Sequence, residues 1–218
     1  MNYQAVLFDM DGLLIDSEPL WREAGQETLA RWGPVLTPEQ YHSSTGLRTE
    51  EWIEHWFHHF DLDRREAPDA VQTIVNKAIE KITHRGVVLP GAREAIALFR
   101  EEGFRVGLAT SSPMELVEVV LEKLALPSAF HAIASAGNLP YGKPHPQVFL
   151  NCAEELGTTP LQCIVFEDSF NGMIAAKAAR MRCVVVPHPE DFESTRWAAA
   201  DLKLRSLAEV DRTLPGRL

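Results

Sequence analysis

Two aspartates separated by a single residue follow a short apolar run near the start of the chain. Residues 5–8 are wholly apolar, as in a strand buried on both faces of a parallel sheet, and Asp9 and Asp11 come directly after them. The carboxyl end of a parallel strand opens into the crevice where α/β proteins bind their ligands. Two carboxylates placed there repel each other unless a cation or a shared proton relieves the repulsion. The pattern therefore favours a carboxylate nucleophile beside a metal-balanced neighbour over a polar turn or a calcium loop.

A hydroxyl-rich turn follows the second predicted strand. This strand is predicted at residues 104–109, and Thr110 and Ser111 come after it. Residues 112–115, Ser-Pro-Met-Glu, have the pattern of a capping box with proline at the first helical position. A helix that begins there would direct free backbone N–H groups toward a bound anion.

A lysine and an acidic pair complete the set. Lys143 lies in a Lys-Pro-His-Pro loop, and Pro144 biases its backbone toward an extended conformation that directs the side chain out of the turn. Glu167 and Asp168 follow an apolar strand predicted at 163–166, where a metal bound by Asp9 would find further oxygen ligands. The order Asp-x-Asp, Thr, Lys and Glu-Asp therefore indicates one shared site rather than chance.

The elements that position these residues alternate between strand and helix from residue 87 onward. This alternation predicts an α/β fold with a doubly wound parallel sheet and right-handed crossovers. Residues 17–86 contain helical stripes and no convincing strand. They are therefore predicted to form an inserted all-helical cap, while residues 1–16 and 87–218 form the core.

Helix starts within the predicted cap follow the polar residues that precede each apolar stripe. The first helix is predicted from Ser17 or Glu18, and a short helix begins at Thr37. Thr49 is expected to cap the next helix and Asp69 the last one.

Composition and charge exclude several classes of protein. The chain has 218 residues and a formal net charge of −10, with no basic stripe to meet the phosphates of a nucleic acid. No apolar run approaches the roughly 20 residues that span a bilayer, and we expect no signal peptide before the first strand. The three cysteines stand in apolar contexts and are expected to be reduced. We therefore expect a cytoplasmic protein that binds neither nucleic acid nor membrane.

The same residues match the four motifs of a known family. Asp9-Met10-Asp11-Gly12, Thr110, Lys143 and Glu167-Asp168-Ser169 resemble the motifs of the haloacid dehalogenase superfamily of phosphatases. The insertion after the first strand is similar to the C1-type helical cap of that superfamily, and the likeness covers essentially the whole chain. Four segments have sequences that most resemble those of bacterial sugar phosphatases, the enzymes named for 2-deoxyglucose 6-phosphate or hexitol phosphates. These segments are residues 11–21, 45–48, 142–149 and 167–173.

The resemblance implies a phosphatase mechanism with a role for each motif residue. Asp9 is expected to accept the phosphoryl group as the nucleophile, and Asp11 to protonate the leaving alkoxide and then deprotonate the attacking water. The expected cofactor is Mg²⁺, with Mn²⁺ as the alternative ion. Its expected ligands are Asp9, the backbone carbonyl of Asp11, Asp168 and Glu167, the last directly or through water. The expected phosphate ligands are Thr110, Ser111 and Lys143.

The cap is expected to recognise the substrate, a small phosphorylated sugar such as a hexose or hexitol phosphate. The residues expected to set specificity are Trp21, Gly46, Leu47 and Arg48. Gly46 permits a tight turn that would let Arg48 reach a polyol hydroxyl, and Trp21 would pack against the carbon face of the sugar. The protein is expected to act as a monomer.

Other functions remain open from the sequence. A β-phosphoglucomutase returns the phosphoryl group to a sugar, but these enzymes carry a histidine in the first cap helix, where this chain has Trp21. A receiver-like signalling domain also phosphorylates an aspartate, but the cap and Asp11 argue against the long-lived phosphate of a switch. Asp11 argues against a dehalogenase as well. A phosphonoacetaldehyde hydrolase needs a Schiff-base lysine in its cap, and the only cap lysines, Lys77 and Lys81, lie near the return linker.

Overall fold

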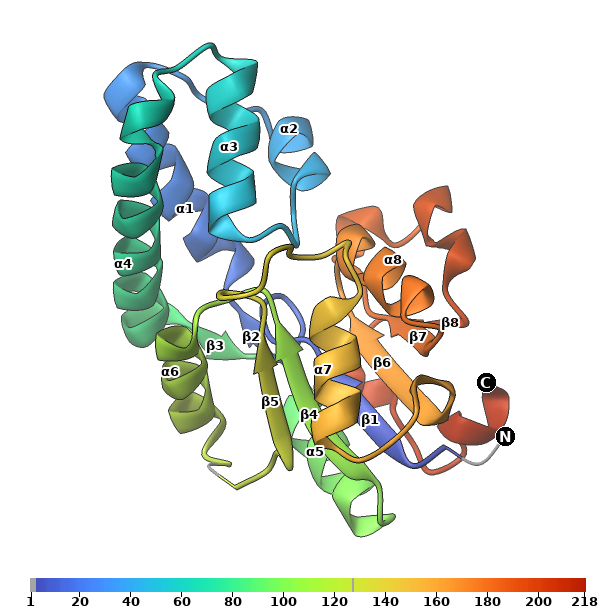
Figure 1. Cartoon of the computed structure of the whole chain (residues 1–218). Coiled ribbons are helices and arrows are strands. Elements are labelled where there is room, and N and C mark those ends of the chain that lie inside the picture. The colour runs from blue at the N-terminus through green and yellow to red at the C-terminus, as the bar shows by residue number, and fades with distance from the viewer. Residues whose placement is uncertain (1–2, 127) are drawn as a thin grey trace.

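Parallel strands form the sheet on which the chain is built in the computed structural model, which describes residues 3–126 and 128–218 (Figure 1). The order across the sheet is β5 (Ala132–Ser135), β4 (Arg105–Thr110), β1 (Ala5–Phe8), β6 (Cys163–Glu167), β7 (Arg182–Val185) and β8 (Leu202–Lys203). Every neighbouring pair is parallel. The predicted parallel α/β sheet is confirmed, and the first strand lies at its centre.

Helices cover both faces of this sheet, which explains why β1 is apolar throughout. Val6 and Phe8 join a core cluster with α5 (Ala92–Glu101) and α6 (Met114–Leu124). Ala5 and Leu7 join a second cluster on the opposite face with helices α7 (Gln147–Glu155) and α8 (Phe170–Ala178). Successive strand residues point to opposite faces, so a strand buried on both faces must be apolar at every position.

Further helices lie between β1 and β4 in the sequence and stand beyond the carboxyl ends of the strands (Figure 1). They are α1 (Glu18–Leu29), α2 (Pro38–Ser43), α3 (Thr49–His59) and α4 (Ala67–Arg85). The chain leaves through β2 (Ile15–Asp16) and returns through β3 (Val87–Val88), and these two short strands pair in antiparallel fashion. We therefore propose residues 17–86 as a cap joined to the core by this double connection.

Some of the predicted helix caps differ from the structure. Arg48 rather than Thr49 occupies the N-cap position of α3, and α4 begins at Ala67, so Asp69 lies inside its first turn. Ser112 does not cap α6, because Pro113 holds that position and the Ser112 hydroxyl bonds to the Asp11 side chain instead. The three predicted caps are therefore wrong, although each lies within three residues of the observed helix start.

Among the described residues 3–126 and 128–218, no helix combines the length and apolar character that crossing a membrane requires.

We predict that Phe99→Ala will destabilise the core strongly. Phe99 is 1% exposed, and its ring lies 6.2 Å from that of Phe8 and 5.6 Å from that of Phe166. Removing a buried phenyl ring leaves a cavity and typically lowers the free energy of unfolding by about 3–5 kcal/mol. Urea unfolding measures this loss. Leu161→Ala is the control, because Leu161 is 57% exposed and its loss should stay within about 0.5 kcal/mol. Equal losses in both variants would contradict the packing.

Candidate active site

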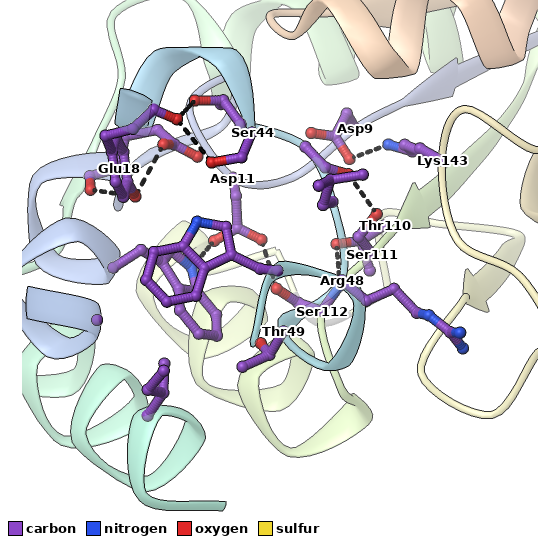
Figure 2. A pocket seen from close by; sticks show the side chains of 18 residues that line it. Asp9, Asp11, Glu18, Ser44, Arg48, Thr49, Thr110, Ser111, Ser112 and Lys143 are labelled. Atoms are coloured by element: carbon purple, nitrogen blue, oxygen red, sulfur yellow. Dashed lines mark hydrogen bonds and ion pairs between the residues drawn. The ribbon is translucent and has the colours of Figure 1, made fainter. Parts of the chain in front are cut away.

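A cavity of about 80 Å³ lies where the carboxyl ends of β1 and β4 meet the cap (Figure 2). Residues of the core that line it are Asp9, Asp11, Thr110, Ser111, Ser112 and Lys143. Residues of the cap that line it include Trp21, Gly46, Leu47 and Arg48. The structure therefore brings the predicted catalytic, phosphate-binding and specificity residues together around one space, and places Glu167 and Asp168 beside Asp9.

Lys143 is the buried cation of this site. Its ammonium donates to Asp9 Oδ1 and to Glu167 Oε1, each at 2.6 Å, and to the carbonyl of Ala109 at 3.1 Å. The side chain is 1% exposed. Burial alone would lower the pKa of Lys143, but the two carboxylates outweigh it and raise that pKa above its ordinary value. Lys143 therefore stays charged and holds Asp9 and Glu167 in fixed orientations.

Glu167 is fully buried and is held from both of its oxygens. Oε1 accepts from Lys143, and Oε2 accepts from the backbone N–H of Ser169 at 3.0 Å and from its hydroxyl at 2.9 Å. The first turn of α8 passes so close that a Cβ on Gly172 would lie 1.8 Å from Glu167 Oε1. The sequence analysis included Ser169 in the fourth motif without a role for it, and it missed Gly172, although a glycine early in a helix was a signal for close approach.

Carboxylates outnumber cations at this edge of the sheet. Oxygens of Asp9, Glu167 and Asp168 lie within 4.8 Å of one another, and the Lys143 ammonium bonds to the first two of these residues. Burial raises the pKa of Asp9 to about 8 even though Lys143 opposes the shift, and burial also raises the pKa of Asp168 well above its ordinary value. A divalent cation would relieve both shifts, and clustered carboxylate oxygens are the ligands that Mg²⁺ prefers. The residues present therefore fit the expected ion.

Asp11 faces the hinge of the cap rather than the acidic cluster. Its Oδ1 accepts from the hydroxyl of Ser17 at 2.7 Å and from the indole N–H of Trp21 at 2.9 Å. Its Oδ2 accepts from the hydroxyl of Ser112 at 2.7 Å, as the dashed lines in Figure 2 mark. This orientation agrees with the expectation that the backbone carbonyl of Asp11, and not its side chain, would meet a metal. Ser17 and Ser112 were not identified as partners of Asp11 from the sequence.

The hydroxyl groups of Thr110 and Ser111, at the end of β4, make hydrogen bonds within the protein. Thr110 is buried, and its Oγ1 accepts from the backbone N–H of Ser112 at 3.0 Å. The hydroxyl of Ser111 donates to the carbonyl of Gly46 in the cap at 3.1 Å. Both residues line the cavity, where a phosphate could reach them. Their roles as phosphate ligands stay predictions.

The guanidinium of Arg48 does not point into the cavity. It donates to carbonyls of a core loop, and Figure 2 shows it directed away from Asp11 and Ser112. The contact to a sugar hydroxyl expected from the sequence is therefore not prepared in this conformation. Glu18, which the sequence did not single out as functional, lines the cavity, and burial raises its pKa to about 7.

Comparisons with known proteins agree with this geometry. A family model described as a haloacid dehalogenase-like hydrolase matches residues 3–180. Hexitol phosphatase B of Escherichia coli K12 is 45% identical over 207 residues, which are 94% of this chain and 93% of that protein. Fructose-1-phosphate phosphatase YqaB of the same strain is 32% identical, covering 85% and 97% of the two chains. The crystal structure of CbbY from Rhodobacter sphaeroides with phosphate superposes with a TM-score of 0.84 at 29% identity, over 95% and 96%.

We predict that the protein without divalent ions loses stability as the pH rises toward about 8. Asp9 has an ordinary pKa of 3.8 and a folded pKa of about 8, so the folded state keeps a proton that the unfolded chain releases. The resulting stabilisation is fully present below about pH 4 and is lost as the pH passes through about 8. Asp168 is shifted in the same direction. Thermal unfolding in excess chelator, followed across this range, measures the effect.

Added Mg²⁺ should raise Tm more at about pH 8 than at about pH 5.5, because the ion replaces protons on the acidic cluster. Glu27 and Asp63 have pKa values lowered to about 2, so the stability that they contribute is lost only as the pH falls. That loss lies below the range from about pH 5.5 to about pH 8 and does not affect the comparison. A Tm of the chelator-treated protein that rises between these two pH values would contradict the expectation.

Proposed function

Because the chain belongs to the haloacid dehalogenase-like hydrolase family, we propose that it hydrolyses phosphate esters of small sugars or sugar alcohols through an aspartyl phosphate. The observation that carries this proposal is the buried contact of 2.6 Å between Lys143 and Asp9 on the floor of the cavity. It fixes one oxygen of Asp9 and leaves the other for attack on phosphorus. The cavity above is covered by cap residues, which supplies a place for a leaving group.

The reaction runs in two steps on this chain's own residues. In the first, a carboxylate oxygen of Asp9 forms a bond to phosphorus while the bond from phosphorus to the sugar oxygen breaks, and Asp11 gives a proton to that oxygen. In the second, water attacks the phosphorus and gives a proton to Asp11, which frees Asp9 and releases phosphate. The Asp11 carboxylate lines the cavity and is held there by the hydroxyl groups of Ser17 and Ser112.

Phosphoryl transfer depends mainly on placement and charge balance. Lys143 supplies a fixed positive charge, and Thr110 and Ser111 supply hydroxyl groups beside it. A divalent ion held by Asp9, Asp168, the carbonyl of Asp11 and, directly or through water, Glu167 would supply further positive charge next to the phosphate. The carbonyl of Ala109 and the donors of Ser169 keep Lys143 and Glu167 in position throughout.

The cap supports a sugar or polyol as the leaving group. Trp21, Gly46 and Leu47 line the cavity above the catalytic residues, so they would surround the part of the substrate that does not react. Relatives named hexitol phosphatase and fructose-1-phosphate phosphatase make six-carbon phosphates the first candidates. A covered cavity also excludes bulk water, which strengthens the interactions between the phosphate and its ligands.

Two alternatives are less well supported. A mutase-type transfer would need an acid–base residue from the cap, whereas the indole N–H that Trp21 offers Asp11 is a hydrogen-bond donor only. A Schiff-base hydrolase needs a cap lysine that reaches the cavity. Lys77 and Lys81 instead bond to Glu27, at 2.9 Å and 2.7 Å, between helices α4 and α1, and neither lysine lines the cavity.

We expect Asp9→Asn to abolish turnover of every substrate while the protein stays folded. The amide cannot act as the nucleophile, and loss of a covalent nucleophile lowers kcat by several orders of magnitude, roughly 10⁴ or more. Phosphate release from a panel of hexose, hexitol and aryl phosphates with Mg²⁺ is the measurement. Asp69→Asn, the same change at an exposed residue of α4, is the control. Activity retained in Asp9→Asn or in excess chelator would refute the proposed function.

We also expect Asp11→Asn to separate chemistry from metal binding. The backbone carbonyl of Asp11 remains in the variant, so Mg²⁺ affinity measured by calorimetry should change little. Removing a general acid–base group costs about 10²–10⁴-fold, so kcat should fall by that factor. Parallel loss of Mg²⁺ affinity and turnover would assign Asp11 to the metal instead.

A further inference from the structure

The start of helix α3 rests on a core loop, residues 136–142, that joins β5 to Lys143. The Arg48 guanidinium donates through Nη1 to the carbonyls of Ala136 and Leu139, and through Nη2 to the carbonyl of Pro140 at 3.2 Å. Its side chain is 12% exposed. Three carbonyl groups of one loop therefore surround a single cationic side chain from the cap.

Glu51, one turn along α3, binds the end of the same loop. Its Oε1 accepts from the backbone N–H of Gly142 at 2.8 Å and lies 3.3 Å from Arg48 Nη2. A Cβ on Gly142 would lie 2.4 Å from Arg48 Cγ and 2.7 Å from Glu51 Oε2. The loop and the helix thus fit so closely that only a glycine is accommodated at position 142.

The loop leads directly into the charge centre of the site. Gly142, which Glu51 holds, is bonded through the chain to Lys143, whose ammonium is 2.6 Å from both Asp9 and Glu167. Displacement of the Gly142 backbone would therefore move the root of the Lys143 side chain. The cap and the phosphate-binding charge are connected by one backbone hydrogen bond and one peptide unit.

We propose that Arg48 and Glu51 form a latch through which the closed cap fixes the 136–142 loop and, with it, Lys143. The two are positioning residues that act on phosphate binding and turnover of any substrate, and this inference rests on the proposed phosphatase function. It differs from a role of Arg48 in reading sugar hydroxyls, because both terminal nitrogens of the guanidinium donate to protein carbonyls, while Nε is buried without a hydrogen-bond partner among the described residues. A latch predicts that substrates too small to fill the cavity are affected as well.

The test compares Glu51→Ala, Arg48→Ala and the double variant on para-nitrophenyl phosphate and on a hexitol phosphate, with Mg²⁺. Misplacement of a catalytic group by a remote change costs up to about 10²-fold, so we expect a loss of kcat of that order with both substrates. Residues that act as one unit are not additive, so the double variant should be no slower than the slower single variant. Glu51→Gln keeps an oxygen that can accept from Gly142 and should stay within about tenfold of the wild type.

Two comparisons guard the interpretation. Glu50→Ala removes the same charge from an exposed position of the same turn and should leave kcat unchanged. Gly142→Ala disrupts the same contact from the core side, because its Cβ would displace Arg48 and Glu51. It should lower kcat to a similar extent, and it tests the latch even where the Arg48 and Glu51 variants fold poorly. A loss confined to the hexitol phosphate, or a lower Tm with kcat unchanged, would overturn the latch.

Calorimetric binding of inorganic phosphate with Mg²⁺ gives a second readout that does not depend on turnover. The latch predicts weaker phosphate binding in Glu51→Ala and Gly142→Ala than in Glu50→Ala. Unchanged phosphate affinity in these variants would overturn the latch. A wild-type protein that hydrolyses none of the phosphate esters would refute the proposed function, but the phosphate-binding test of the latch would still apply.

Discussion

The site depends on keeping Asp9, Glu167 and Asp168 together in a buried place beside a single lysine. Burial raises the pKa of Asp9 to about 8 although Lys143 is 2.6 Å away, so one ammonium does not compensate three carboxylates. Fixed donors such as those of Ser169 supply part of the remaining compensation, and a divalent cation would supply more. The same excess of negative charge fits a divalent cation, and with such a cation bound the site would no longer repel a phosphate.

The sheet makes this arrangement possible because its centre is rigid and apolar. The rings of Phe8 and Phe166 stack at 5.0 Å, one residue before Asp9 and Glu167 in their respective strands. Strand pairing holds the two residues in register, so the carboxylates that follow them emerge side by side. Close packing beneath the site leaves the acids little freedom to move apart. Their mutual repulsion therefore persists, and it favours the binding of a cation between them.

Sequence patterns predicted what depends on local chemistry. The apolar strand before Asp9, the helix from Met114 to Leu124 and the run of helices after β2 were all readable, because burial and periodicity act over a few residues. The motifs also predicted that Asp9, Lys143 and Glu167 share a site, but individual hydrogen bonds of other residues across the fold were not readable. Ser112 looked like a helix cap but bonds to Asp11, 101 positions away, and Arg48 looked like a substrate ligand but binds a loop about 90 positions away. Several partners are locally possible for each of these side chains, and tertiary packing determines which of them it bonds to.

The cap contacts both halves of the chemistry. Trp21 donates to Asp11, the proposed acid–base residue, and Glu51 accepts from Gly142, the neighbour of Lys143. An open cap would loosen both contacts together, so an unoccupied or wrongly occupied site would lack a well-placed lysine and a held acid. A substrate that stabilises closure through its sugar thereby assembles the groups that act on its phosphate. Specificity for the leaving group can then appear in turnover as well as in binding, even though no cap residue needs to touch the phosphate.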